Sequence, residues 1–170
     1  MLISAHAGFP RWLHSGADFI ELDIRRDGGG RVVIAHDEVQ PGDKHATYDE
    51  VLGAMNGSIG LHLDLKEAGF EVDLVTRALE RVPPNRLVVT PDFTESGRVI
   101  KERFPQIRVS PIDFVTVDQR YIGDARQGLP IWVWTVDDRK LMRRLMADPR
   151  IECIVTNRPD VALKLRRARS

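Results

Sequence analysis

The 170-residue chain has a single cysteine, Cys153, which excludes an internal disulfide. Cys153 lies in the apolar run IECIVT, where we expect a small buried side chain, and this fits a reducing compartment. No apolar run reaches the roughly 18 residues of a membrane-spanning helix, and no signal-like segment opens the chain. The sequence therefore predicts a soluble, cytoplasmic protein.

The chain also lacks an excess of either charge, because Lys plus Arg and Asp plus Glu each number 25. No global field would attract nucleic acid or an anionic membrane, so any recognition of an anion must be local. The carboxy-terminal stretch KLRRARS is basic, and we interpret it as a solvated helix end. We expect no nucleic-acid partner and no membrane contact.

Apolar residues make up 42% of the chain, which suits one globular domain over residues 1–170. Helical patterns separate the later of its strand-like runs, and this alternation predicts a mainly parallel sheet. The expected strands lie near residues 2–7, 19–25, 32–36, 60–66, 86–90, 106–110, 130–135 and 151–156, and the expected helices near 48–55, 70–82, 96–104, 138–147 and 160–168. Eight strands in a chain shorter than the roughly 200 residues of small barrels predict an α/β fold, a compact irregular TIM (β/α)8-type barrel with reduced helices.

The interval between the second and third strands is too short for a parallel crossover, which needs about a dozen residues. Residues 26–31 read RDGGGR, which is the composition of a hairpin turn. If a hairpin forms here, the third strand runs antiparallel to the second, but the sequence leaves the direction of this strand open. A turn near Gly28 would place His36 roughly opposite Glu21.

Charged side chains recur on one face of the predicted strands. Because side chains alternate between faces, Glu21 and Asp23 project together from the run FIELDI, as do Asp64 and Lys66 from GLHLDLK. Their neighbours on the other face are apolar. Unpaired buried carboxylates cost several kcal/mol each, so these groups must converge on a compensating partner. A divalent metal ion and a phosphate would serve.

The order of motifs resembles the glycerophosphodiester phosphodiesterases, within the wider group of phospholipase-C-like barrel phosphodiesterases that includes sphingomyelinase D. The matching stretches span the chain: His6-Ala7-Gly8, residues 16–37 (GADFIELDIRRDGGGRVVIAHD), LDLK at 63–66, VWTVDD at 133–138 and VTNRPD at 155–160.

This resemblance implies a role for each charged position. It implies that Glu21, Asp23 and Asp64 bind a metal ion. It also implies that His6 and His36 exchange protons and that Lys66 contacts a phosphate oxygen. Hard oxygen ligands suit Mg²⁺ or Ca²⁺. Two imidazoles on opposite sides of a phosphodiester could deprotonate the nucleophile and protonate the leaving alkoxide.

The chain departs from the family pattern at two of these motifs. Glycerophosphodiester phosphodiesterases typically carry arginine after the first histidine, whereas this chain has Ala7 and so lacks one phosphate ligand. They also usually have glutamate two residues before the lysine, where this chain has the shorter Asp64. Sphingomyelinase D enzymes share both of these features.

Four further positions admit two interpretations each. Trp134 occupies a pocket position in the family and could bind substrate, or it could fill the core. His62 shares the face of Asp64 but lies deeper, so we interpret it as a hydrogen-bonded histidine of the barrel interior. Asp92 and Asn157 follow late strands and could support the site or cap loops.

The sequence thus predicts a phosphoric diester hydrolase that cleaves glycerophosphodiesters or lysophospholipids with one bound Mg²⁺ or Ca²⁺. Two alternatives remain open at this point. One is a noncatalytic barrel module that binds metal or phosphate, and the other is a metal-dependent sugar-phosphate isomerase on the same fold. Missing helices would leave apolar strand faces exposed, so we favour a homodimer.

Overall fold

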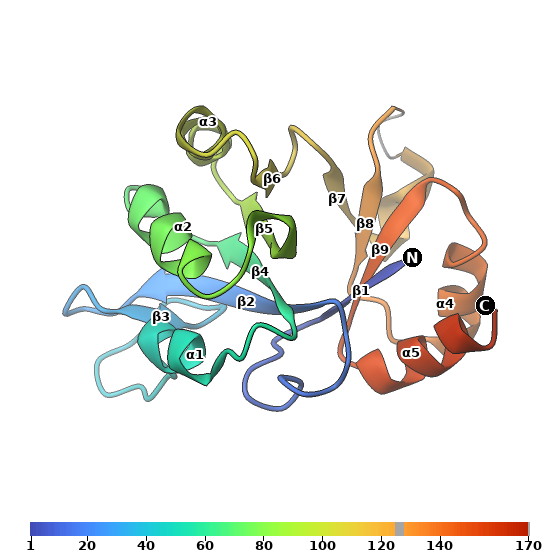
Figure 1. The fold of residues 1–170 in the computed structure, drawn as a ribbon, viewed down its shortest axis with the longest axis horizontal. Helices are drawn as coiled ribbons and strands as arrows, with labels where there is room; N and C mark the ends of the chain where they lie inside the picture. Colours follow the sequence, from blue (N-terminus) through green and yellow to red (C-terminus); the bar gives the residue numbers. More distant parts are fainter. Residues whose placement is uncertain (125–127, 170) are drawn as a thin grey trace.

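A single large sheet curls into an open barrel. The computed structural model describes residues 1–124 and 128–169. Within these residues the sheet order is β6-β5-β4-β2-β1-β9-β8-β7, with neighbouring strands parallel and no pairing between β6 and β7. The strands are β1 (Leu2–Ala5), β2 (Phe19–Arg26), β4 (Gly60–Leu65), β5 (Leu87–Pro91), β6 (Arg108–Val109), β7 (Val115–Asp118), β8 (Ile131–Trp134) and β9 (Ile151–Thr156). The predicted TIM-type barrel is confirmed, open between β6 and β7 (Figure 1).

The third predicted strand forms a hairpin and lies outside the ring of parallel strands. Strand β3 (Val32–Ile34) pairs antiparallel with β2, with Ile24 opposite Ile34, which decides the direction that the sequence left open. Asp27 holds the turn, because its carboxylate accepts hydrogen bonds from the backbone N–H groups of Gly29 and Arg31. The hairpin prediction is confirmed, whereas the count of barrel strands needs a correction, because β7 takes the eighth place.

Strand β7 was not predicted because its sequence, VTVD, alternates apolar and polar residues and forms no apolar run. All four of its residues are half-buried, so neither face carries the strong signal of a buried strand. Its partner β8 supplies the apolar content of this part of the sheet, since Ile131, Trp132 and Val133 are all buried.

The five predicted helices are confirmed to within two residues at most ends. They are α1 (Tyr48–Ala54), α2 (Glu71–Leu79), α3 (Thr94–Arg103), α4 (Arg139–Leu145) and α5 (Pro159–Arg167), joined by the 3-10 turns η1 (Pro84–Arg86) and η2 (Gln119–Asp124). Thr47 and Glu50 form a capping box that begins α1. Helices α1 to α3 lie on one side of the barrel and α4 and α5 on the other (Figure 1). No α-helix lies in the connections 6–18 and 110–114.

Two apolar clusters fill the space on either side of the sheet. The larger joins helices to outward strand residues such as Ile20, Leu22 and Leu63. The smaller fills the barrel interior near the amino ends of the strands, where Trp132 contacts Phe19 and Phe114 at ring-centroid distances of 5.5 and 4.7 Å. It also buries Cys153, as expected. The barrel interior is thus filled with apolar side chains at this end.

No helix among residues 1–124 and 128–169 is both long and apolar enough to span a membrane.

Candidate active site

A pocket of about 590 Å³ opens at the carboxyl ends of the parallel strands, where β/α barrels place their active sites. Charged and imidazole side chains at or just after the carboxyl ends of β1, β2, β4 and β5, and in the loop after β3, form one side. Neutral residues at the ends of the later strands form the other side. Its lining comprises His6, Glu21, Asp23, His36, His62, Asp64, Lys66, Thr90, Pro91, Asp92, Ser110, Thr116, Trp134, Thr135 and Val155. Every catalytic, metal-binding and substrate-binding residue predicted from the sequence lines this one pocket.

Strand register brings the acidic residues together. In the parallel pairing of β2 with β4, Glu21 lies opposite His62 and Asp23 lies opposite Asp64. Residues at alternate positions share a face, so all four side chains point into the barrel. Sequence alternation predicts the shared face within each strand, and the register adds the alignment between strands.

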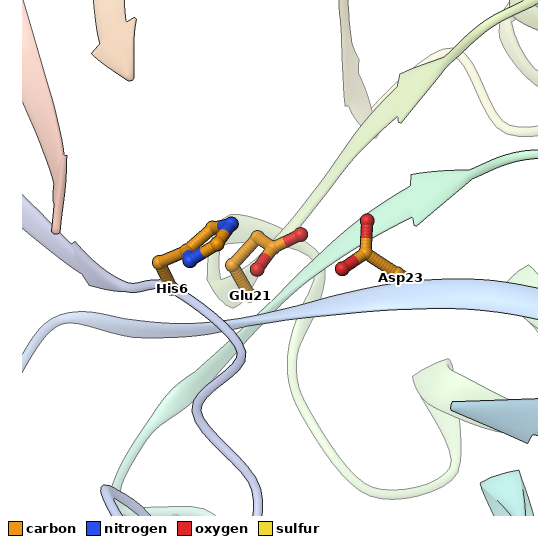
Figure 2. A group of neighbouring side chains, drawn as sticks. All are labelled: His6, Glu21 and Asp23. Carbon is orange, nitrogen blue, oxygen red and sulfur yellow. The ribbon is translucent and has the colours of Figure 1, made fainter. Parts of the chain in front are cut away.

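His6, Glu21 and Asp23 form a compact group of potential metal ligands. One donor atom from each lies within 4.8 Å of the others, and Figure 2 shows the imidazole of His6 turned toward the two side chains that project from β2. Glu21 and Asp23 are buried, while His6 is half-buried. Within the described residues Asp64 does not belong to this group, although it lines the same pocket.

Burial gives this group an electrostatic cost. It raises the pKa of Glu21 to about 8, with repulsion from Asp23 and Asp64 adding to the effect, although Ala7 N–H and Lys66 act in the opposite direction. Burial likewise raises the pKa of Asp64. Two carboxylates and an imidazole that converge at this range can bind a hard divalent cation, which would compensate the buried negative charge. The residues present therefore fit the Mg²⁺ or Ca²⁺ that the sequence predicts.

Lys66 lies between the two acidic positions of the neighbouring strands. Its Nζ donates a hydrogen bond to Asp64 at 2.9 Å and lies 3.3 Å from Asp23. Burial lowers the pKa of this ammonium group, but the charges of Asp64 and Asp23 outweigh it and raise the pKa overall. Lys66 is therefore a permanent positive charge in the pocket, suited to an anionic substrate.

His6 is oriented by residues that follow β8 and β9. Its Nδ1 lies 2.8 Å from Oδ1 of Asn157, and the Asn157 amide donates to Asp137 at 2.8 Å. Thr156 Oγ1 and Asn157 N–H also donate hydrogen bonds to Asp137. Burial alone would raise the pKa of Asp137, but these hydrogen bonds outweigh it and lower the pKa. Because Asn157 Oδ1 is an acceptor, His6 carries its proton on Nδ1 and presents Nε2 to the pocket.

His36 occupies an exposed position at the edge of the pocket, in the loop that follows β3. Its Nδ1 lies 2.8 Å from the carboxylate of Asp37, and its backbone carbonyl accepts a hydrogen bond from Arg25. The contact with Asp37 leaves the Nε2 atom of His36 free, just as the contact with Asn157 leaves the Nε2 atom of His6 free. The pocket therefore holds two imidazoles, each with one nitrogen occupied by an acceptor.

His62 forms part of the buried lining. Its ring nitrogens lie 3.1 Å from the hydroxyl oxygens of Ser4 and Thr90, and its ring packs edge-on against Trp132. Burial lowers the pKa of His62 to about 3, with smaller effects from His6 and Lys66. His62 is therefore neutral at physiological pH, as the interpretation of a hydrogen-bonded interior histidine requires.

The solved structures that resemble this chain include several glycerophosphodiester phosphodiesterases. A glycerophosphodiester phosphodiesterase from Parabacteroides distasonis has a TM-score of 0.80 at 19% identity, with 99% of this chain and 97% of that chain covered. One from Thermotoga maritima has a TM-score of 0.73 at 16% identity, with 98% and 97% covered. The chain has the fold of the glycerophosphodiester phosphodiesterases.

A third structure with this phosphodiesterase fold contains a ligand. The Oleispira antarctica phosphodiesterase, in complex with the product sn-glycerol-3-phosphate, has a TM-score of 0.65 at 14% identity, with 98% of this chain and 97% of that chain covered. No family model and no curated protein sequence matches the chain significantly, so the likeness rests on structure.

Ala7 has a structural role within the phosphodiesterase fold. Its backbone N–H donates to the Glu21 carboxylate at 2.8 Å, and its φ of 44° is the only positive value for a non-glycine residue of the described chain. Its side chain is exposed. The absence of arginine here removes a cation while the backbone contact that orients Glu21 remains.

Trp134 ends β8 and forms part of the neutral side of the pocket, with 43% of its surface exposed. It therefore does not fill the core. Asp137 is a supporting residue that the sequence did not single out, although it lies within the VWTVDD stretch. The sequence did not predict the contact between Asp137 and Asn157, because the two residues belong to different loops.

Proposed function

We propose that the protein is a metal-dependent phosphodiesterase that hydrolyses glycerophosphodiesters or lysophospholipids. The observation that carries the proposal is the two-sided pocket, in which a buried group of acids with Lys66 faces a neutral side that ends in Trp134. The charged side suits a phosphate, and the neutral side suits a glycerol or acyl-glycerol group. The neighbours named for this activity support the same reaction class.

In this proposal Glu21 and Asp23, with Asp64, hold one Mg²⁺ or Ca²⁺. A ring nitrogen of His6 lies close enough to the carboxylates for His6 to join them or to exchange a proton beside them. A bound cation would stabilise negative charge on the phosphoryl oxygens. Lys66 would do the same from the neighbouring strand, since its ammonium is charged throughout the physiological range.

Proton transfer is assigned to the two histidines. His6 and His36 each present a free Nε2, so one can accept a proton from the nucleophile while the other donates one to the leaving alkoxide. Trp134 packs against the organic part of the substrate. Attack by water gives an open monoester, and attack by a hydroxyl group of the substrate gives a cyclic phosphate.

Hydrolysis of a generic chromogenic phosphodiester tests the reaction class. We expect release of the chromophore with Mg²⁺ or Ca²⁺, its loss on chelation, and its loss in Glu21→Ala. Metal binding without release of any alcohol would identify the noncatalytic module instead. Turnover of a sugar-phosphate monoester without release of an alcohol would identify the isomerase.

A further inference from the structure

Three aromatic side chains are exposed near the carboxyl ends of the parallel strands, the end of the barrel at which the pocket opens. Among the described residues, Phe93, Tyr121 and Trp134 are the exposed aromatics, with 50%, 56% and 43% of their surfaces accessible. They follow or end β5, β7 and β8, and the carboxyl ends of parallel strands share one edge of the sheet. We call them the rim aromatics. Burying an aromatic side chain contributes about 1.5–3 kcal/mol, so their exposure forgoes stability.

The rim aromatics sit on ordered backbone. Tyr121 lies in η2, which is held against the end of β8 by a 2.8 Å hydrogen bond from the Gln119 side chain to the Thr135 carbonyl. Phe93 is the N-cap residue of α3, and its carbonyl accepts a bond from Gly97 N–H. Trp134 belongs to β8 itself and also lines the pocket. Their exposure is therefore built into the fold.

Cations flank the rim where α4 and α5 begin. Arg139, Lys140 and Arg158 are exposed, and no ion pair within the described residues involves them. A helix start does not stabilise positive charge, so helix stability does not explain their positions. The acids Asp118, Asp137 and Asp138 are engaged with Arg120, Asn157 and the α4 N-terminus. Exposed Asp92, Asp124 and Asp160 limit the net charge.

We propose that the rim aromatics dock the protein onto a phospholipid surface, with the pocket mouth facing the lipid. Aromatic side chains are favoured at the boundary between headgroups and acyl chains, and the flanking cations match lipid phosphates. A second copy of this chain bound at the rim would cover the mouth, since Trp134 belongs to both surfaces. The proposed docking surface consists of side chains that only the fold brings together and exposes. The overall charge of the chain, which is zero, therefore gave no indication of membrane contact.

This inference extends the proposed function, because a docked enzyme could take a lysophospholipid directly from the membrane. Docking itself needs no turnover and is measured separately. Co-sedimentation with vesicles of phosphatidylcholine and phosphatidylglycerol compares wild type with the variant Phe93→Ser/Tyr121→Ser. Serine is a good N-cap, so this variant should remain folded. We expect wild type to bind and the variant to lose at least about tenfold in affinity, in proportion to the lost apolar area.

The matched control is Lys164→Ser/Arg167→Ser, which removes exposed charge from the carboxy-terminal part of α5 and leaves the rim intact. We expect this control to bind vesicles as wild type does. Failure of wild type to bind would overturn the proposal, as would equal binding by the rim variant or loss confined to the α5 control. So would a homodimer that the rim substitutions dissociate. Chromogenic turnover in solution should be unchanged in the rim variant, which separates loss of docking from loss of activity.

Discussion

The buried carboxylate of Glu21 controls how stability depends on pH. Its pKa rises from 4.5 to about 8 on folding because burial and nearby acids disfavour the charged form. The folded state thus binds this proton more tightly than the unfolded state, and its contribution to stability is lost as pH rises from about 4.5 to 8. Glu21→Gln removes that loss.

Thermal unfolding in the presence of a chelator tests this directly. At pH 8 we expect Glu21→Gln to melt at least about 2 °C above wild type, with the difference shrinking toward pH 5. Exposed Glu38 provides the control, and Glu38→Gln should follow wild type at both pH values. A Glu21→Gln protein that is less stable than wild type at pH 8 would contradict the electrostatic account.

His36 separates proton transfer from metal binding. It lines the pocket but lies outside the compact group of His6, Glu21 and Asp23. We expect His36→Ala to lower kcat by about 10²–10⁴-fold, the usual loss for a general acid or base. Calorimetric titration with Mg²⁺ or Ca²⁺ should give an unchanged affinity. Undiminished turnover in the variant would refute the assigned role.

At the scale of the structural elements, the loops that follow β8 and β9 orient His6, which follows the carboxyl end of β1. Asp137 holds Asn157, which accepts from Nδ1 of His6. We expect Asp137→Asn to lower kcat/KM by about 10–100-fold, the range found when such supporting partners are removed. The pH profile should shift as well, because the preferred tautomer of His6 is lost.

Asp138→Asn is the matched control for this element. Asp138 caps α4 through Leu141 N–H, and asparagine is an equally good N-cap. We expect its activity and pH profile to equal those of wild type. If Asp137→Asn lowered thermal stability while leaving kcat/KM and the pH profile intact, the role of Asp137 would be structural only.

Elements with a strong periodic signal were predictable from the sequence. The hairpin followed from the turn composition of residues 26–31, and the shared face of Glu21 and Asp23 followed from the alternation of strand side chains. Strand β7 was not predictable because its half-buried residues lack that signal. Asp64 forms a hydrogen bond with Lys66 and lies outside the group of His6, Glu21 and Asp23, and these side-chain contacts carry no signal in the sequence.

The whole chain shares one apolar cluster that includes Ile3 near one end and Leu165 near the other. We therefore propose a single domain over residues 1–170 that unfolds in one cooperative transition. Calorimetry should give equal calorimetric and van't Hoff enthalpies. Two resolved transitions would show that the two halves of the open sheet are separate units.

At the scale of the whole molecule, the proposed activity is metal-dependent turnover of a phosphodiester in this pocket. The most direct measurement is a ³¹P NMR time course with glycerophosphocholine and lysophosphatidylcholine, with Mg²⁺ or Ca²⁺ and after chelation, for wild type and Glu21→Ala. We predict conversion of at least one substrate to a phosphomonoester or cyclic phosphate by the metal-supplied wild type alone. Unchanged phosphodiester in the metal-supplied wild type, or conversion that survives chelation and the substitution, would contradict the account.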